Sequence, residues 1–282
     1  MQRPEYPRRF VSPSEPLSDW TGIEPYFAKL QQADIDTPER IAAWLLDWSE
    51  LAAGIDEVAR RLYVRMTCQT DDAERKQAYL DFVEHVEPKC KPMWHAVDRK
   101  YVSSATSNAS PSDRFAVFDR SARNRVDLFR DENVALEVEE AKLEQKFQEV
   151  TAAMTVHYDG RDQTLQQLAI YLERTDRKVR QEVWELIANR RMDDADTLED
   201  IFDELFQLRH RMARNADLPD FRAYIFKGRE RFDYTPDDCM AFHDAVEKTC
   251  VPLMRALQDE RKNKLGVTQL RPWDLSVDIK GR

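Results

Sequence analysis

Hydrophobic residues recur along most of the chain at the three- and four-residue spacing of an amphipathic helix. The longest stripe follows Thr37-Pro38, where a capping hydroxyl and a proline at the first helical position mark a helix start. It continues for about six turns and consists of Ile41, Trp44, Leu45, Trp48, Leu51, Ile55, Val58 and Leu62. Gly54 lies inside the stripe and indicates a close helix approach or a bend. The pattern predicts a mainly helical protein.

The same spacing predicts helices before and after this stripe. Ser18 is the expected cap of the preceding helix, and Thr70-Asp71-Asp72 of the following one. Residues 1–17 contain four prolines and should be extended. We expect a kink around Pro88 and Pro92, and an exposed loop from Ser103 to Ser112, where small polar residues cluster. Helical spacing resumes after the loop, in two helices that reach Met154.

Residues 154–164 depart from the helical pattern. Val156 and Tyr158 alternate with polar residues, and Asp159-Gly160 is a favourable hairpin turn. Thr164 is placed to cap the next helix. We therefore predict one short β-hairpin near 154–163 in an otherwise helical fold.

The stretch from Leu205 to Asp278 is the most distinctive part of the chain. A charged amphipathic helix should end near Asn215, and an aromatic-rich connector over 221–234 should follow. Thr235-Pro236 is typical of the start of a second long helix, which we expect Pro252 to interrupt. The stretch closes on Arg271-Pro272-Trp273-Asp274, where Trp273 could pack in the core or line a binding channel.

Composition narrows the possible functions. Only 6 residues are glycine and 34% are charged, as suits a helical protein. The net charge of −10 argues against general nucleic-acid binding, which needs a basic face. No apolar run is long enough for a membrane helix, and the N-terminus lacks a secretory signal. Four scattered cysteines do not make a disulfide framework, so we expect a cytoplasmic protein without membrane partners.

The candidate metal ligands do not have the spacing of a known zinc motif. The five histidines include no pair four residues apart, so the HExxH zinc-peptidase motif is absent. Cys239, His243 and Cys250 share one helix face, but Cys250 lies about 16 Å along the axis from Cys239. We expect that face to be buried and apolar. His85, Cys90 and His95 are close in sequence without an evident fourth ligand.

Other catalytic motifs are also missing. The chain has no GxSxG elbow, Walker A or GxGxxG sequence. Asp193-Asp194 and Asp237-Asp238 lie where helices should begin, and the helix dipole accounts for them. We assign no catalytic or metal residue, and the substrate-binding residues stay unknown.

Residues from about Met154 to Asp278 resemble the M3 family of zinc oligopeptidases (oligoendopeptidase F and thimet-like enzymes). The matching pieces, in order, are YDGRDQTLQQLAIYLERTDRKVRQEVWE, LFQLRHRMARNADLPDFRAY, RFDYTPDDCMAFHDAVEKTCVPL and LGVTQLRPWD. The resemblance implies a channel-type helical peptidase fold, with residues 1–175 as a helical N-terminal lobe and 176–282 as the beginning of the peptidase domain. In such enzymes Zn²⁺ is held by the two histidines of HExxH and a distant glutamate.

The resemblance implies that the intact protein is a zinc-dependent oligoendopeptidase that hydrolyses short peptides. The expected zinc-binding segment would follow Arg282, so we expect this polypeptide to be an inactive N-terminal portion that binds no zinc and needs a C-terminal catalytic segment as its partner. A second hypothesis is a non-catalytic helical module that binds peptides or proteins. A third is a structural protein that self-associates through the charged 130–150 helix, whose heptads are few.

Overall fold

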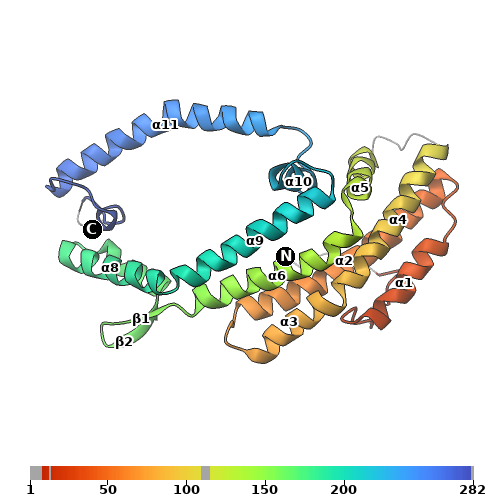
Figure 1. Ribbon diagram of the computed structural model, residues 1–282, viewed down its shortest axis with the longest axis horizontal. Coiled ribbons are helices and arrows are strands. Elements are labelled where there is room, and N and C mark those ends of the chain that lie inside the picture. The colour runs from red at the N-terminus through yellow and green to blue at the C-terminus, as the bar shows by residue number, and fades with distance from the viewer. Residues whose placement is uncertain (1–7, 13, 109–114, 281–282) are drawn as a thin grey trace. The chain divides into compact units, whose positions relative to one another are not determined.

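The computed structural model describes residues 8–12, 14–108 and 115–280, and these form two compact units. Unit 1 contains residues up to Gln148 together with Glu204–Glu230, and unit 2 contains Glu149–Asp203 and Arg231 onward. Two long helices, α6 (Asp131–Ala152) and α9 (Ala195–Asn215), each contribute to both units. The arrangement confirms the predicted mainly helical fold with one short hairpin (Figure 1).

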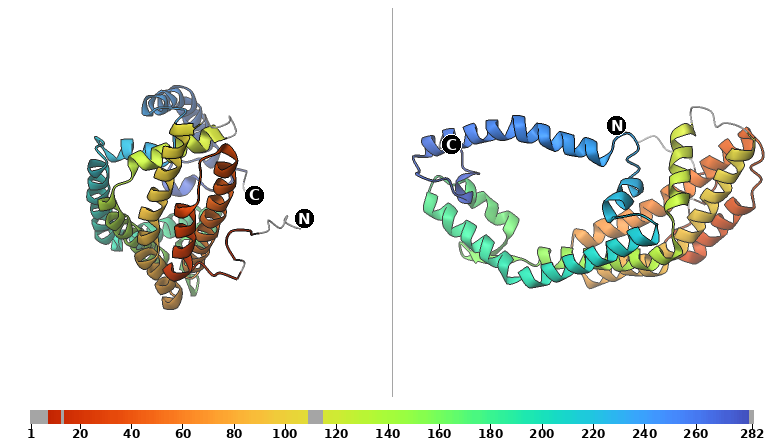
Figure 2. Two further views of the ribbon diagram at one scale, coloured as in Figure 1. Left: turned by 90° about the vertical axis from the view of Figure 1, so that its right-hand side faces the viewer. Right: turned by 45° about the horizontal axis from the view of Figure 1, so that its top comes forward.

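Unit 1 is a helical bundle. Its helices before α6 are α1 (Trp20–Gln32), α2 (Pro38–Thr67), α3 (Ala73–His85), α4 (Glu87–Asn108) and α5 (Ala116–Leu128). The C-terminal part of α9 and then α10 (Phe221–Gly228) complete it. Figure 2 shows α1 to α4 lying side by side. Leu208 and Met212 in the C-terminal part of α9 pack with Leu136 of α6.

The main core of unit 1 contains several aromatic residues that contact one another. The rings of Phe27 and Trp94 meet edge to face with centroids 4.5 Å apart, and Trp44 stacks on Tyr101. Gly54 is buried where α2 meets the N-terminal segment: a Cβ at this position would lie 2.5 Å from Leu17 Cδ1. Gly54 thus marks a close approach, but the approaching segment is the non-helical stretch before α1 and not a second helix.

The helix starts in unit 1 follow the predicted capping residues. Thr37 accepts a hydrogen bond from the backbone N–H of Arg40, and Asp72 caps α3. The cap of α1 is Asp19, one residue later than predicted. The helical run is interrupted in the predicted kinked region, because α3 ends at His85 and α4 begins at Glu87 with Pro88 in its first turn. The helix continues past Pro92.

The predicted loop over 103–112 is wrong in its first half. α4 runs to Asn108 through the small polar residues, because serine and threonine are tolerated in a helix whose neighbours already fix it. The second half of that prediction, 109–112, lies outside the described residues. Residues 1–7 of the predicted extended segment lie outside them as well.

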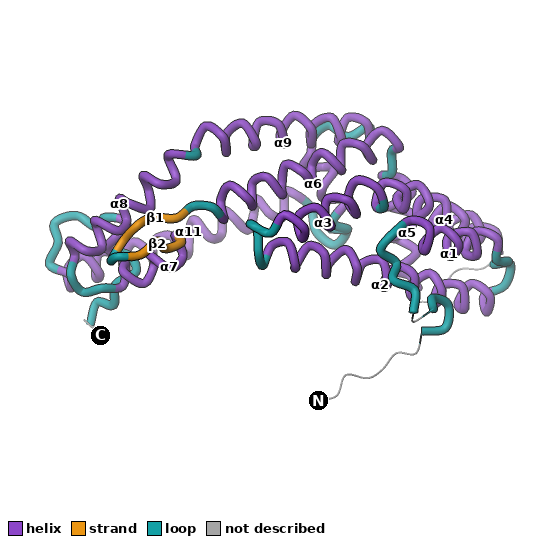
Figure 3. Tube along the Cα trace, turned by 90° about the horizontal axis from the view of Figure 1, so that it is seen from below, coloured by secondary structure: helices purple, strands orange, loops and turns teal. Residues whose placement is uncertain are grey.

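Unit 2 contains the hairpin, formed by β1 (Thr155–Tyr158) and β2 (Arg161–Thr164). Tyr158 pairs with Arg161 across a turn in which Asp159 and Gly160 have φ of 53° and 75°. The prediction of a hairpin here is confirmed, and its left-handed turn residues are the types that tolerate positive φ. Figure 3 shows the hairpin, in orange, beside α7 (Leu165–Leu168), which Thr164 caps.

The rest of unit 2 consists of a short 3₁₀ segment, η2 (Ala169–Glu173), then α8 (Arg177–Asp193), the beginning of α9, α11 (Pro236–Leu265) and η3 (Pro272–Asp274). Its core is a cluster of Met154, Leu165, Leu168, Val183 and Ile187. Through this cluster the hairpin and α7 pack against α8. None of the helices in the described part of the chain is long and apolar enough to cross a membrane.

Two predictions about the C-terminal stretch are wrong. The aromatic connector contains a helix, α10, which Asp220 caps and whose Tyr224 is buried in unit 1. Pro252 does not interrupt α11, which continues to a left-handed Gly266. Because Lys248 and Pro252 are both exposed, water can bind the carbonyl that loses its helical donor, so the proline does not break the helix.

Candidate functional site

Unit 1 contains three adjoining cavities that share Lys91. Their volumes are about 430, 440 and 220 Å³. Lys91 is on α4 and pairs with Glu137 of α6 at 2.5 Å. Because Lys91 lines all three cavities, it lies where they meet. Trp94 lines two of the cavities, and Tyr224 of α10 also lines two. These side chains come from helices that are distant in sequence, so the three cavities form only when unit 1 folds.

The largely apolar cavity of 430 Å³ also has a charged edge. Its apolar wall includes Trp48, Phe82 and Trp94. At the edge, Arg125 Nε and Nη2 donate to the two carboxylate oxygens of Asp98 at 2.7 and 3.1 Å. The Arg125 guanidinium also lies 5.6 Å from the centre of the Trp48 ring. Burial alone would lower the pKa of Arg125, but the hydrogen bond to Asp98 and the negative charge of Asp98 outweigh burial and raise the pKa of Arg125.

Burial shifts the pKa of two further side chains that line this cavity, Glu87 and Cys90. Burial raises the pKa of Glu87, and the nearby positive charge of Lys91 offsets only part of that effect. Burial also raises the pKa of Cys90 to about 12, so its thiol stays protonated at neutral pH. The Nε1–H of Trp48 has no hydrogen-bond partner among the described residues. An apolar wall with a few polar groups at its edge suits an apolar or aromatic side chain with a polar backbone attached.

The described residues do not fit a zinc ion. They include no group of three His, Cys, Asp or Glu side chains arranged to hold a metal. Cys90 is buried away from other thiols, whereas His85 ends α3 and His95 stacks on Phe129 with centroids 4.2 Å apart. Burial lowers the pKa of His95. The structure thus does not bring the sequence candidates of this segment together.

The candidates on α11 also stay apart, and one expectation about them is wrong. Cys239 is half-buried, and His243 and Cys250 are exposed. The predicted burial of this face fails because no residue of α11 is buried. Asp238 forms a capping box with Thr235, as expected for an acidic residue in a first turn. Asp193 ends α8, and Asp194, which pairs with Arg190, directly precedes the start of α9 at Ala195.

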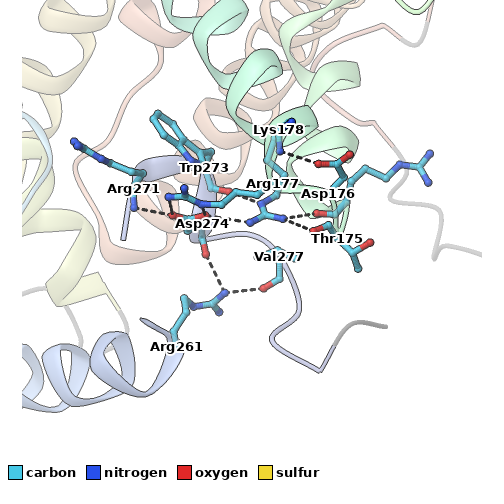
Figure 4. Close-up of polar contacts among 11 residues, drawn as sticks. Thr175, Asp176, Arg177, Lys178, Arg261, Arg271, Trp273, Asp274 and Val277 are labelled. Atoms are coloured by element: carbon cyan, nitrogen blue, oxygen red, sulfur yellow. Dashed lines mark hydrogen bonds and ion pairs between the residues drawn. The ribbon is translucent and has the colours of Figure 1, made fainter. Parts of the chain in front are cut away.

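The most extensive polar cluster of unit 2 surrounds Asp274 (Figure 4). Arg177 donates through Nε and Nη2 to the two carboxylate oxygens, each at 2.9 Å. Arg180 Nη2 donates to Oδ1 at 3.1 Å, and the backbone N–H of Arg271 donates to Oδ2 at 2.9 Å. Burial alone would raise the pKa of Asp274, but these donors outweigh burial and lower it to about 2. The carboxylate is therefore ionised, with four donors filling its acceptor sites.

Arg180 extends the cluster along the backbone. It is 2% exposed and donates to the carbonyls of Arg174, Thr175 and Trp273. On the far side, Arg261 of α11 donates to the carbonyls of Asp274 and Val277 (Figure 4). The cluster fixes the 271–277 segment to α8 and to the end of α11. With no free acceptor on Asp274, it is a structural site and not a catalytic one.

Of the two roles that the sequence allowed for Trp273, packing or lining a channel, the structure shows packing. Its ring lies 5.5 Å from that of Trp184, and the Arg177 guanidinium lies 5.9 Å from its centre. Sequence analysis singled out Arg271–Asp274 but missed the partners Arg177, Arg180 and Arg261. The three-residue spacing of Arg177 and Arg180, which places both on one helix face, was the available signal.

Comparison with known proteins supports the predicted resemblance. Residues 170–278 match the sequence model of peptidase family M3. The fold matches PZ peptidase A, solved with an inhibitor, with a TM-score of 0.87 and 22% identity over 93% of this chain. It also matches two structures assigned as oligoendopeptidase F, the second from Bacillus anthracis. Their TM-scores are 0.86 and 0.83, with 21% and 19% identity over 94% and 93% of this chain.

The chain spans about half the length of these structures, covering 47%, 47% and 48% of them. No curated protein matches the chain. At these identities the solved structures establish the fold, and the family match establishes the M3 resemblance over residues 170–278.

Proposed function

We propose that this chain, whose residues 170–278 match peptidase family M3, supplies the N-terminal part of a zinc-dependent oligoendopeptidase that hydrolyses short peptides in the cytoplasm. The family match carries this proposal. The chain covers 47% of PZ peptidase A at a TM-score of 0.87, which accords with a contribution to one part of such an enzyme. We assign residues 1–175 to the helical lobe and 176–282 to the beginning of the peptidase domain.

Zinc would be held outside the residues described here. When bound, it would polarise the scissile carbonyl and activate a water molecule. No HExxH motif occurs in the 282 residues, and the described side chains offer no alternative ligand set. We therefore assign no step of hydrolysis to this chain and infer that the polypeptide alone is inactive.

The proposal has a direct test in two parts. The 282-residue chain, incubated with zinc and a quenched fluorescent peptide, should show no turnover beyond the buffer control. A polypeptide extended by the coding sequence after Arg282 should contain HExxH and cleave the same peptide, with loss of activity on chelation. Metal-dependent turnover by the 282-residue chain would refute the inactive-part assignment. An extension without a zinc motif would refute the peptidase assignment.

The cavities around Lys91 favour a second candidate, a module that binds peptides without cleaving them. Their aromatic walls and charged edge resemble a site for an apolar peptide side chain. A short peptide with one aromatic residue should then alter the fluorescence of Trp48 and Trp94 on binding to this chain. Trp94→Leu should weaken that binding, whereas Trp184→Leu, in unit 2, should not. Equal weakening by both substitutions would exclude the cavity as the site.

A further inference from the structure

One acidic side chain in the cavity of about 430 Å³ has no partner among the described residues. The other charged residues that line this cavity are each in an ion pair: Asp56 with Arg60, Asp98 with Arg125, and Lys91 with Glu137. The exception is the half-buried Glu87, whose carboxylate forms neither a hydrogen bond nor an ion pair within the described part of the chain. The cavity therefore leaves an acceptor available to a ligand.

The carboxylate of Glu87 is free because another helix has taken its nearest cation. A glutamate and a lysine four residues later on a helix commonly pair, but Lys91 instead contacts Glu137 of α6 at 2.5 Å. Glu87 lies in the first turn of α4, where the helix dipole favours the ionised form. Burial nevertheless raises the pKa of Glu87, because the charges of Lys91 and Arg60 offset burial only in part. A cation bound in the cavity would stabilise this carboxylate.

The walls beside Glu87 leave space for an aromatic ring. Ala52 and Ala59 of α2 line the cavity, and their small side chains do not fill it. The rings of Trp48 and Trp94 form an aromatic wall, with centroids 5.5 Å apart. Trp94 lies on the same face of α4 as Glu87, about two turns or 10 Å along the axis. A ring that packs against this wall can therefore place a group on a short chain beside the carboxylate.

The charges of the cavity favour an amine over an acid or a neutral ligand. Both basic residues that line it, Lys91 and Arg125, are already held by carboxylates, so a ligand carboxylate would meet only the repulsion of Glu87. A neutral ligand would exclude water from Glu87 without supplying a countercharge, which is costly. A primary ammonium group supplies three hydrogen-bond donors and a positive charge. Ammonium groups also bind favourably against tryptophan rings.

We propose that this cavity binds an aromatic primary amine, with the ammonium group at Glu87 and the ring against Trp48 and Trp94. The required chemistry is an unblocked amino group a short chain away from a ring, as in a free amine or an aromatic residue at the N-terminus of a peptide. All the residues that line the cavity belong to unit 1. The site goes beyond both functions proposed above, because it requires neither hydrolysis nor an internal peptide side chain.

Titration of the 282-residue chain with phenethylamine and with phenethyl alcohol, followed by ligand-detected NMR at neutral pH, tests the charge requirement. The amine should bind with a Kd of about 0.1–1 mM, as expected for so small a ligand. The alcohol, which has the same ring without the charge, should bind at least about tenfold more weakly. Glu87→Gln should weaken binding of the amine to the level of the alcohol and leave the alcohol unchanged.

Two further variants separate the site from general effects of charge and folding. Asp56→Asn removes a carboxylate that lines the same cavity but is already paired with Arg60, so amine binding should change by less than about twofold. Ala59→Leu fills the cavity without changing a charge and should abolish binding of both ligands. Circular dichroism should show the same helicity in all three variants, because each substituted side chain is at least partly exposed.

Two peptides distinguish the sources of the amine. Binding of phenylalanyl-glycinamide as tightly as phenethylamine would support the proposal with a peptide N-terminus as the ligand. Binding of phenethylamine alone would support it with a free amine as the ligand. If the N-acetylated peptide bound as tightly as the unblocked one, the proposal would be overturned and the cavity assigned to an internal aromatic side chain.

Four other results would overturn the proposal. They are no binding of phenethylamine at about 5 mM, equal binding of the amine and the alcohol, equal weakening by Glu87→Gln and Asp56→Asn, and amine binding that survives Ala59→Leu. None of them bears on peptide cleavage by the extended polypeptide, so the proposed peptidase function would be tested separately.

Discussion

Arg180 and Asp274 form an ion pair at 3.1 Å in which the side chains are 2% and 0% exposed. They are 94 residues apart in sequence and lie on α8 and η3. A buried charge that loses its partner costs far more than an exposed one, because water cannot replace the lost interaction. The integrity of unit 2 should therefore depend strongly on this pair.

Asp274→Asn should lower the free energy of unfolding by about 3–5 kcal/mol, since it leaves two arginines without a countercharge. Urea unfolding followed by tryptophan fluorescence measures the effect, because Trp184 and Trp273 lie beside the cluster. Asp56→Asn is the matched control. It removes a carboxylate paired with Arg60 at an exposed site and should cost under about 1 kcal/mol. Equal effects of the two substitutions would contradict the prediction.

The carboxylate of Asp274 should make the free energy of unfolding depend on pH in the acidic range. The pKa of Asp274 is about 2 in the folded protein, below its ordinary value of 3.8. Because the pKa is lower in the folded state than in the unfolded state, the carboxylate stabilises the protein at pH values above its unfolded-state pKa. That contribution is lost as the pH falls from about 4 toward 2. The difference in unfolding free energy between wild type and Asp274→Asn should therefore shrink between about pH 4 and pH 2. A difference that stays constant would mean that the carboxylate does not titrate in this window.

Gly54→Ala should destabilise unit 1 despite the higher helix propensity of alanine. The added Cβ would lie 2.5 Å from Leu17 Cδ1, and such overpacking costs about 1–3 kcal/mol. In a Leu17→Ala background the obstacle is gone, and Gly54→Ala should then stabilise by up to about 1 kcal/mol. Thermal unfolding of the four proteins measures this change of sign. A penalty that persists without Leu17 would contradict the proposed contact.

Cys90 should resist alkylation in the native protein. Its thiol is buried, and with a pKa of about 12 almost none is thiolate at neutral pH. Cys68 is exposed and serves as the internal control. Mass spectrometry after brief iodoacetamide treatment should find Cys68 modified and Cys90 unmodified until urea is added. Equal modification rates would mean that α4 opens readily.

The sequence alone correctly predicted features that depend only on residues close to one another in sequence. The cap at Thr37 and the turn at Asp159-Gly160 are determined within a few positions, and both are found where predicted. The interruption expected near Pro88 is found between α3 and α4, whereas α4 continues past Pro92 and the break expected at Pro252 was wrong. Local propensity alone did not show that Pro252 lies on an exposed side of its helix.

The candidate sites were harder to predict because they assemble over long sequence distances. Asp274 was singled out as part of a motif, but its partners on α8 lie nearly a hundred residues earlier. The Lys91 cavities are lined by residues of α2 to α6, α9 and α10, and no local motif marks them. The burial of α11 was predicted from its apolar stripe, yet periodicity shows only that a face needs a partner, not that the chain supplies one.

The hydrogen bonds that surround Arg180 set a limit on how the gene can be shortened. A polypeptide cut before Arg271 would keep α8 but lose Asp274 and the Trp273 carbonyl, so Arg180 would keep only the carbonyls of Arg174 and Thr175 and would lose its countercharge. Such a product should be less stable, because a buried charge without its partner is costly. A useful expression boundary for unit 2 therefore lies beyond Val277, whose carbonyl anchors Arg261.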